Sequence, residues 1–321
     1  MSMAWRPTAT LAALQRRAAM LAAARNFFAE RGVLEVETPI LSAAAVSDPH
    51  IESLTTRVSG VPAPVYLCTS PEYAMKRLLA AGSGDIYQIC RVFRDAERGR
   101  WHNPEFTLIE WYRLGFDDAA LMNEVEALVG CLLAPHRVLE PAETLSYSTA
   151  LRRHAGVDPN SASDNDLTEA ATRHGIVCDA ELGRDAKLDL LMGLIVGPRL
   201  GLQAPCFIVD YPASQAALAR LKPGLPPVAA RFELYLDGLE LANGFHELVD
   251  GGEQRQRFTQ ELNLRRARGQ VEPPLDERLL AALAAGMPDC AGVALGFDRL
   301  VAIALGAPQL AAAMAFTIDN A

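Results

Sequence analysis

The sequence predicts an α+β fold in which one antiparallel sheet is flanked by helices. Two runs rich in apolar, β-branched and aromatic residues, 86–93 and 106–112, are separated by a charged loop, as in an antiparallel hairpin. Asp237-Gly238 lies between two alternating runs, which is a strong signal for a second hairpin. Helical segments stand between these hairpins instead of alternating with single strands, so a parallel doubly wound sheet is disfavoured.

The composition is that of a globular protein with a large core. Half of the 321 residues are hydrophobic, and the formal net charge is −9. This charge argues against sequence-independent binding to nucleic acid, which needs an excess of Lys and Arg. The six cysteines form no Cys-x-x-Cys pair, so free thiols are expected and a zinc site is not. We recognise no signal peptide or membrane span and expect a cytoplasmic protein without membrane contact.

The first part of the chain is expected to alternate helices with short strands. Residues 8–31 carry apolar side chains at helical spacing and end before Gly32, which suits a C-terminal cap. Pro39 cannot donate to a strand ladder, so the strand before it should end there or lie at an edge. The other elements predicted here are strands at 33–39 and 65–68, a helix at 73–81, and a helix from Asp117 or Asp118 to about 133.

Residues from about 135 to 205 are expected to form a helical insertion in a single domain spanning 1–321. Ser163-Asp164 should cap a helix that runs to about His174, and a second helix is predicted at 185–199. The elements predicted beyond are a strand at 207–210, helices at 251–269 and 275–286, and a glycine-punctuated strand that enters a helix at 292–300.

The loop of the first hairpin is rich in potential cations. Guanidinium groups grip phosphate oxygens bidentately, and an aromatic ring can stack on a base. The pattern therefore indicates a nucleoside triphosphate site, with a solvated hairpin as the alternative. The residues concerned are Arg94, Arg98, Arg100, His102 and, just beyond them, Phe106.

The second hairpin carries two acids in positions suited to a metal ion. With the turn at 237–238, Glu240 lies opposite Tyr235, and Glu233 points to the same face as Tyr235. Like charges this close favour a cation between them, and magnesium with phosphate co-ligands meets that need. Two unrelated surface glutamates are the alternative.

These segments resemble the three signature motifs of the class II aminoacyl-tRNA synthetases. Residues 32–41 resemble motif 1, the hairpin 91–113 resembles motif 2, and 296–299 resembles motif 3. His102-Asn103-Pro104-Glu105-Phe106 and Glu240-Leu241-Ala242-Asn243-Gly244-Phe245 are similar to the lysyl-tRNA synthetase versions. Motif 1 begins after a single helix, with no anticodon-binding barrel before it. The chain is therefore most similar to the stand-alone paralogues, the elongation factor P–(R)-β-lysine ligases, a match that residues 242–248 and 286–290 strengthen.

The resemblance implies a ligase that forms an amide bond. In that family, ATP activates (R)-β-lysine or lysine to an aminoacyl-adenylate, and the product is joined to a lysine side chain of elongation factor P. It further implies Mg²⁺, a homodimer built through motif 1, and no stable binding of tRNA. The alternatives are a truncated lysyl-tRNA synthetase-like enzyme with another acceptor, a relative that makes a free amide, and an inactive regulatory module. Retention of Arg94, Arg299, Glu233 and Glu240 argues against the inactive module.

The resemblance also implies roles for individual residues. Arg94 and Arg299 would be catalytic, Glu72 would bind the amine near the reacting carboxylate, and Glu247 would bind the far ammonium with Tyr112. The implied substrate-binding residues are Ser70, Pro71, Glu72, Glu110, Tyr112, Asn243, Glu247 and Ala294. The implied ATP-binding residues are Arg94, Asp95, Ala96, His102, Asn103, Phe106, Glu240, Leu241, Gly296 and Arg299. The implied metal ligands are Glu233 and Glu240.

Two positions depart from the family pattern. Ala96 stands where motif 2 commonly has a glutamate that contacts adenine, so the backbone would have to replace that contact. Ala294 stands where the tRNA synthetases normally have glycine. A methyl group there would reshape the amino-acid pocket, which fits a substrate with a displaced amine.

Overall fold

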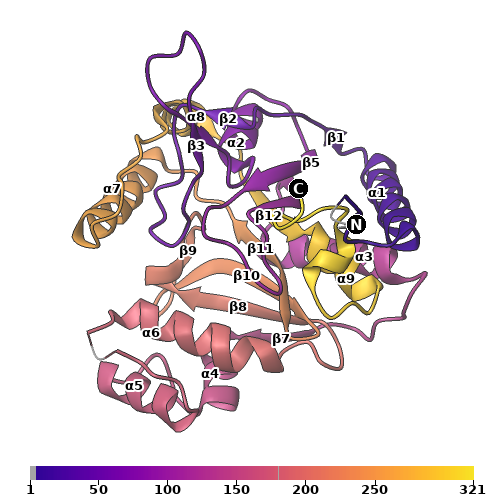
Figure 1. Ribbon diagram of the computed structural model, residues 1–321. Helices are drawn as coiled ribbons and strands as arrows, with labels where there is room; N and C mark the ends of the chain where they lie inside the picture. The colour runs from indigo at the N-terminus through magenta and orange to yellow at the C-terminus, as the bar shows by residue number, and fades with distance from the viewer. Residues whose placement is uncertain (1–4, 180) are drawn as a thin grey trace.

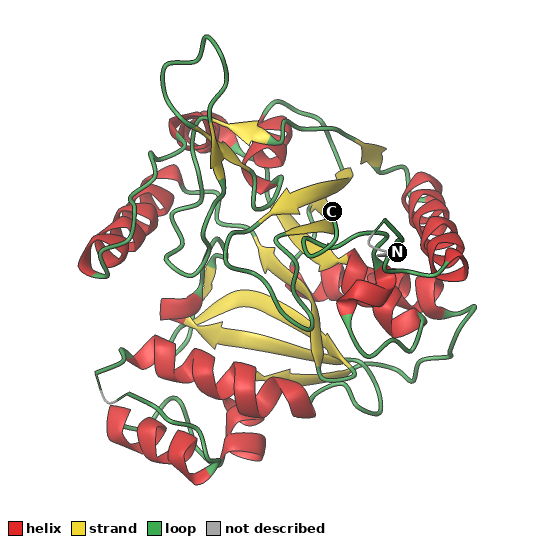
Figure 2. Ribbon diagram, in the orientation of Figure 1, coloured by secondary structure: helices red, strands yellow, loops and turns green. Residues whose placement is uncertain are grey.

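The computed structural model describes residues 5–179 and 181–321, and a nine-stranded sheet lies at its centre (Figures 1 and 2). Among the described strands, β1 with β5 and β7 with β8 pair in parallel, and all other neighbours in this sheet are antiparallel. The predicted antiparallel α+β class is therefore confirmed. In their order across the sheet, the strands are β1 (Leu34–Glu35), β5 (Ile86–Phe93), β6 (Glu105–Leu114), β12 (Cys290–Gly296), β11 (Leu239–His246), β10 (Val228–Leu236), β8 (Cys206–Pro212) and β7 (Glu143–Ser146), with β9 (Leu221–Lys222) paired to β10. A second, three-stranded sheet has the order β2 (Leu41–Ser42), β4 (Val65–Leu67) and β3 (Thr55–Thr56).

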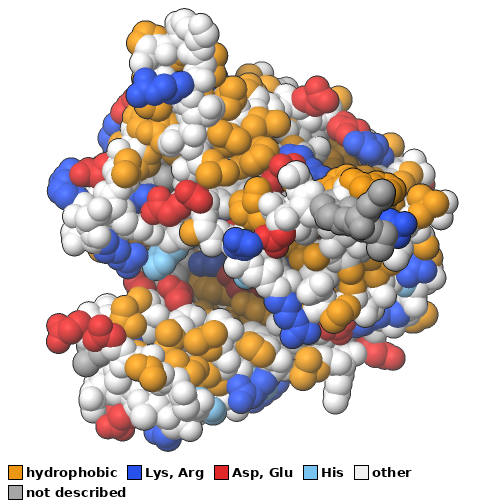
Figure 3. Space-filling model, viewed as in Figure 1, with side chains coloured by type: hydrophobic (Ala, Val, Ile, Leu, Met, Phe, Trp, Pro, Cys, Tyr) orange, Lys and Arg blue, Asp and Glu red, His pale blue; other side chains and the backbone are white. Residues whose placement is uncertain are grey.

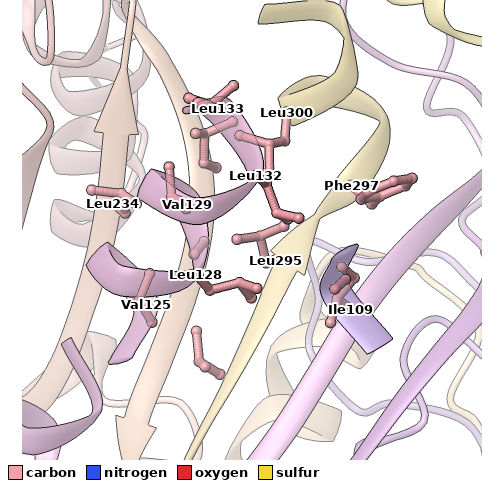
Figure 4. Packing of buried hydrophobic residues seen from close by; sticks show 14 of the residues in the cluster. Ile109, Val125, Leu128, Val129, Leu132, Leu133, Leu234, Leu295, Phe297 and Leu300 are labelled. Atoms are coloured by element: carbon pink, nitrogen blue, oxygen red, sulfur yellow. The ribbon is translucent and has the colours of Figure 1, made fainter. Parts of the chain in front are cut away.

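The largest core packs three helices against the centre of the sheet. These helices are α1 (Leu11–Glu30), α3 (Asp118–Leu133) and α9 (Phe297–Ala304). Figure 4 shows Leu128 and Val129 of α3 between Leu234 of β10 and Leu295 of β12. Burial of these apolar side chains stabilises the strands that carry the site.

Two further helical groups complete the molecule. The helices α2 (Glu72–Ala80), α7 (Gly251–Ala267) and α8 (Glu277–Gly286) share a smaller core with β5, β6 and β12. A third core joins β7, β8 and β10 to α4 (Tyr147–Ala155), α5 (Asp164–Arg173) and α6 (Arg184–Leu191). The space-filling view shows a hollow above the part built by α4, α5 and α6 (Figure 3).

Most predicted helix boundaries are confirmed, and their caps show why. Asp117 accepts a hydrogen bond from Ala120 N at the start of α3, and Ser163 takes part in a capping box at the start of α5. Gly32 follows α1 with φ of 67°, a left-handed conformation that glycine adopts readily.

Two segments differ from the sequence-based prediction. The helix predicted at 185–199 is α-helical only in α6. Residues 192–196 form a short π-helix, and 197–199 form a 3₁₀ helix that includes Pro198. Residues 135–205 hold α5 and α6 where helices were predicted, but they also form α4, which was not predicted, and add β7 to the edge of the large sheet. The single-domain organisation stays a prediction.

All six cysteines are free thiols, as predicted. No helix in the described part of the chain has the length and apolar character needed to cross a membrane.

Candidate active site

A cavity of about 530 Å³ collects most of the predicted site residues. All predicted substrate-binding residues line it: Ser70, Pro71, Glu72, Glu110, Tyr112, Asn243, Glu247 and Ala294. Most of the predicted ATP-binding residues line it as well: Arg94, His102, Asn103, Phe106, Glu240, Leu241, Gly296 and Arg299. Asp95, Ala96 and Glu233 are not among its lining residues.

Strand register places the cavity floor on β6, β12 and β11. Ala294 of β12 lies directly between Glu110 of β6 and Asn243 of β11. Two residues earlier, Gly292 is opposite Tyr112. A Cβ atom at Gly292 would lie 2.2 Å from the Tyr112 ring and 2.5 Å from Oε1 of Glu247. The absence of a side chain at Gly292 therefore lets these two groups meet above the strand.

The cavity lining includes a cluster of carboxylates, of which Glu110 and Glu247 are buried. Glu110 accepts hydrogen bonds from the Ser70 hydroxyl at 2.7 Å and from the Tyr112 hydroxyl at 2.8 Å. Burial, helped by the nearby Glu72, raises the pKa of Glu110 to about 8. Burial also raises the pKa of Glu247 to about 7, although Lys76 lowers it. Such a cluster favours cationic groups, since each bound ammonium relieves the repulsion between carboxylates.

The sequence pattern did not predict the role of Lys76 in this cluster. Its Nζ atom lies 2.7 Å from Oε1 of Glu72 and 2.6 Å from Oε2 of Glu247. The one sequence signal is the i,i+4 spacing of Glu72 and Lys76 on α2. The contact with Glu247 joins segments far apart in the chain and has no local signature.

The cavity is also lined by two arginines, Arg94 and Arg299. The Arg94 guanidinium lies over the Phe106 ring, 5.0 Å from its centre, and its ion pair with Glu97 is long at 3.4 Å. Arg299 donates to the backbone oxygen of Glu240 at 2.8 Å, and its Nη2 lies 2.9 Å from Nε2 of His102. These guanidinium groups can bind phosphate oxygens because neither is held by a close carboxylate.

Three of the predicted loop cations are corrected by the structure. Burial first, and then the charges of Arg299 and Arg94, lowers the pKa of His102, so its ring is neutral at neutral pH. Arg98 pairs with Asp319, and Arg100 donates to the backbone oxygen of Pro308 at 2.6 Å. The last two arginines lie outside the cavity lining.

Asp95 and Ala96 sit on the exposed side of the loop. The Asp95 carboxylate accepts a hydrogen bond from Ala96 N at 2.8 Å, and Ala96 has φ of 61°. Neither side chain reaches the cavity. Their assignment to ATP stays a prediction.

The strand pairing of the second hairpin is as predicted, and it brings Glu233 and Glu240 near one another. Tyr235 is paired with Glu240 across the strands, and the Tyr235 hydroxyl donates to Oε2 of Glu233 at 2.7 Å. Glu233 also accepts from Arg231 at 2.5 Å, which holds its carboxylate away from the cavity. Burial and the charge of Glu233 raise the pKa of Glu240 to about 7. Glu240 is therefore the acid that faces the cavity, and Glu233 lies behind it.

A protein-family model and curated relatives both match nearly the whole chain. The family model described as tRNA synthetases class II (D, K and N) matches residues 2–320. Curated relatives from Salmonella dublin, Salmonella paratyphi B and Salmonella heidelberg carry the name elongation factor P--(R)-beta-lysine ligase. Each is 52% identical over 323 aligned positions, covering 99% of this chain and 98% of the relative.

Proposed function

Because the chain belongs to the class II tRNA synthetase family, we propose that it is an ATP-dependent ligase that attaches (R)-β-lysine to elongation factor P. One observation carries this proposal: a single cavity is lined both by the carboxylates of Glu72, Glu110 and Glu247 and by the guanidinium groups of Arg94 and Arg299. Glu72 and Glu247 suit the two ammonium groups of a lysine isomer, while Arg94 and Arg299 suit phosphates and a carboxylate.

The chemistry has two steps and needs no protein nucleophile. A carboxylate oxygen of the amino acid attacks the α-phosphorus of ATP, and the bond to the departing pyrophosphate breaks. Arg94 stabilises the charge that develops at the α-phosphate. The acceptor lysine amine then loses a proton and attacks the adenylate carbonyl, and AMP leaves with the electrons of the broken C–O bond. The protein contributes placement and electrostatic stabilisation to both steps.

The acids of the second hairpin fit a magnesium ion carried by the nucleotide. No group of three or more His, Cys, Asp or Glu able to hold a metal occurs among residues 5–179 and 181–321. Mg²⁺ bound to ATP needs only one or two protein carboxylates, because phosphates and waters supply its other ligands. Glu240 would hold the ion, which when bound would neutralise phosphate charge, and Glu233, whose carboxylate is bound by Arg231 and Tyr235, would add negative charge behind it.

A side-by-side transfer assay tests the proposal. We expect the protein, given ATP and (R)-β-lysine, to add one residue to a lysine of elongation factor P, measured as the intact mass of the factor. Transfer RNA in the parallel reaction should stay uncharged. If labelled lysine isomers were transferred to tRNA and not to the factor, the result would favour a truncated synthetase. If no lysine isomer supported pyrophosphate exchange, the result would favour an inactive module.

Ala294 should tune the choice between lysine isomers. Its methyl group lies in the cavity between Glu110 and Asn243, so Ala294→Gly enlarges the floor beneath the substrate. A change of one methyl group is worth about 1–3 kcal/mol of discrimination. We expect the variant to use α-lysine better relative to (R)-β-lysine, as measured by the ratio of kcat/KM values in pyrophosphate exchange. An unchanged ratio would separate Ala294 from substrate selection.

We also expect a homodimer formed through the predicted motif 1. Apolar side chains are exposed along this segment: Leu34 is 54% exposed and Ile40 is 42% exposed. Burial of such residues against their two-fold mates would remove apolar surface from water. Light scattering at micromolar concentration should give twice the chain mass of 34.7 kDa. A wild-type mass equal to that of one chain would contradict the dimer. A dimer mass that Leu34→Glu leaves unaltered would contradict an interface through this segment.

A further inference from the structure

Lys76 is a fully enclosed cation whose partners both belong to the cavity. The residue is 1% exposed and does not line the cavity, whereas Glu72 and Glu247 do. Burial lowers the pKa of Lys76, but Glu247 and Glu72 outweigh this effect and raise it above its ordinary value. Lys76 is therefore charged at neutral pH. It is placed to act on a ligand through the two carboxylates that it touches.

Lys76 is the one partner of the Glu247 carboxylate within the described part of the chain. Glu247 is 0% exposed, and apart from its ion pair with Lys76 neither carboxylate oxygen has a hydrogen-bond donor in the described part of the chain. Lys76 lies beside Oε2, and Oε1 faces the space above Gly292. A buried carboxylate with an unused oxygen is costly unless a donor arrives, and an ammonium group of the substrate is such a donor.

We infer that Lys76 is a positioning residue for substrate selection, whose one ammonium pairs with both Glu72 and Glu247 and holds them close together so that they can receive the two ammonium groups of a diamino acid. This inference rests on the proposed function. It differs from a purely structural ion pair between α2 and β11 because it requires the charge of Lys76 to control the affinity for the amino acid.

The ionisation of Glu247 gives the inference a measurable signature. Burial raises the pKa of Glu247, and Lys76 is the larger of the two charges that lower it, the other being Arg220, so removal of the lysine charge should raise this pKa further. A protonated Glu247 cannot pair with an ammonium group, so binding should weaken at low pH. The charged and titratable groups around Glu247 are Lys76 and Glu72 of α2, Glu110 and Tyr112 of β6, Cys290 of β12, and Arg220.

The test is the pH dependence of pyrophosphate exchange by Lys76→Met between pH 6 and 9. Loss of a neighbouring opposite charge moves a carboxyl pKa by about 1–3 units, so the acidic limb of kcat/KM for (R)-β-lysine should move up by that amount. At pH 7 the KM for (R)-β-lysine should rise about tenfold or more, because each unit of pKa above the assay pH lowers the ionised fraction about tenfold. The KM for ATP should change less than about twofold.

Lys222→Met is the matched control. Lys222 also bridges two carboxylates, Asp118 at 2.6 Å and Asp210 at 3.0 Å, but none of the three lines the cavity. This variant should keep the wild-type pH profile. If Lys76→Met does not fold, as judged by thermal unfolding, Lys76→Gln is measured instead and should show the same shift.

The possible outcomes separate the inference from the proposed function. A folded Lys76 variant with an unmoved acidic limb, beside an active wild type, would overturn only the role of Lys76. Equal losses for ATP and (R)-β-lysine at every pH would also overturn it, because they would show a structural role alone. A wild type that performs no exchange with any lysine isomer would overturn both.

Discussion

Glu240→Gln should reduce ATP–pyrophosphate exchange by about 10³-fold or more while leaving the protein folded, because charge stabilisation at the transferring phosphate is worth several kcal/mol. Glu240 lines the cavity, and the Arg299 guanidinium contacts its backbone oxygen rather than its carboxylate. Glutamine keeps the volume of the side chain and removes only its charge. Exchange rates measured across a magnesium titration should show a weaker dependence on the ion than in the wild type, and a chelator should stop the wild-type reaction.

Glu240 is a cleaner test than its partner Glu233. Glu233 accepts hydrogen bonds from Arg231 and Tyr235, so its neutralisation would leave the Arg231 guanidinium without its counter-ion and destabilise the fold. Glu105→Gln is the control for Glu240→Gln, because Glu105 is exposed and its ion pair with Arg91 is long at 3.6 Å. Wild-type exchange in a folded Glu240→Gln protein would remove Glu240 from the metal and ATP site.

The features that could be predicted from the sequence are those with local signals. The Asp237-Gly238 turn set the register that puts Glu240 opposite Tyr235, and the apolar runs on either side of the cationic loop fixed the hairpin of β5 and β6. Each depends on residues that are close together in the chain.

Other features depend on contacts between distant segments. The strand β7 joins the sheet by pairing with β8, about sixty residues later, and no local pattern specifies that partner. The bridge from Lys76 to Glu247 likewise joins α2 to the end of β11. The cations of the loop were predicted as a group, because the sequence does not show which way each side chain points. In the structure, Arg98 and Arg100 bind other partners and do not line the cavity.

Arg94→Ala should lower kcat for adenylate formation by about 10³-fold or more, with a smaller change in the KM for ATP. The Arg94 guanidinium lies over the Phe106 ring, and both its bond to the Thr69 backbone oxygen and its pair with Glu97 are 3.4 Å long. These weak contacts leave its donors available for the charge that develops at the α-phosphate. Because that charge is largest in the transition state, the loss should fall on kcat rather than on binding.

Two further variants decide whether the loss comes from charge, from geometry or from folding. Arg94→Lys keeps a positive charge but not the planar pair of donors, so its rate should lie between those of the wild type and Arg94→Ala. Arg91→Ala is the control, because Arg91 lies on β5 three residues before Arg94, is half exposed and does not line the cavity. It should retain the wild-type rate in single-turnover measurements of adenylate formation. If Arg91→Ala and Arg94→Ala lose the same activity, the effect belongs to the stability of β5, and Arg94 has no catalytic role.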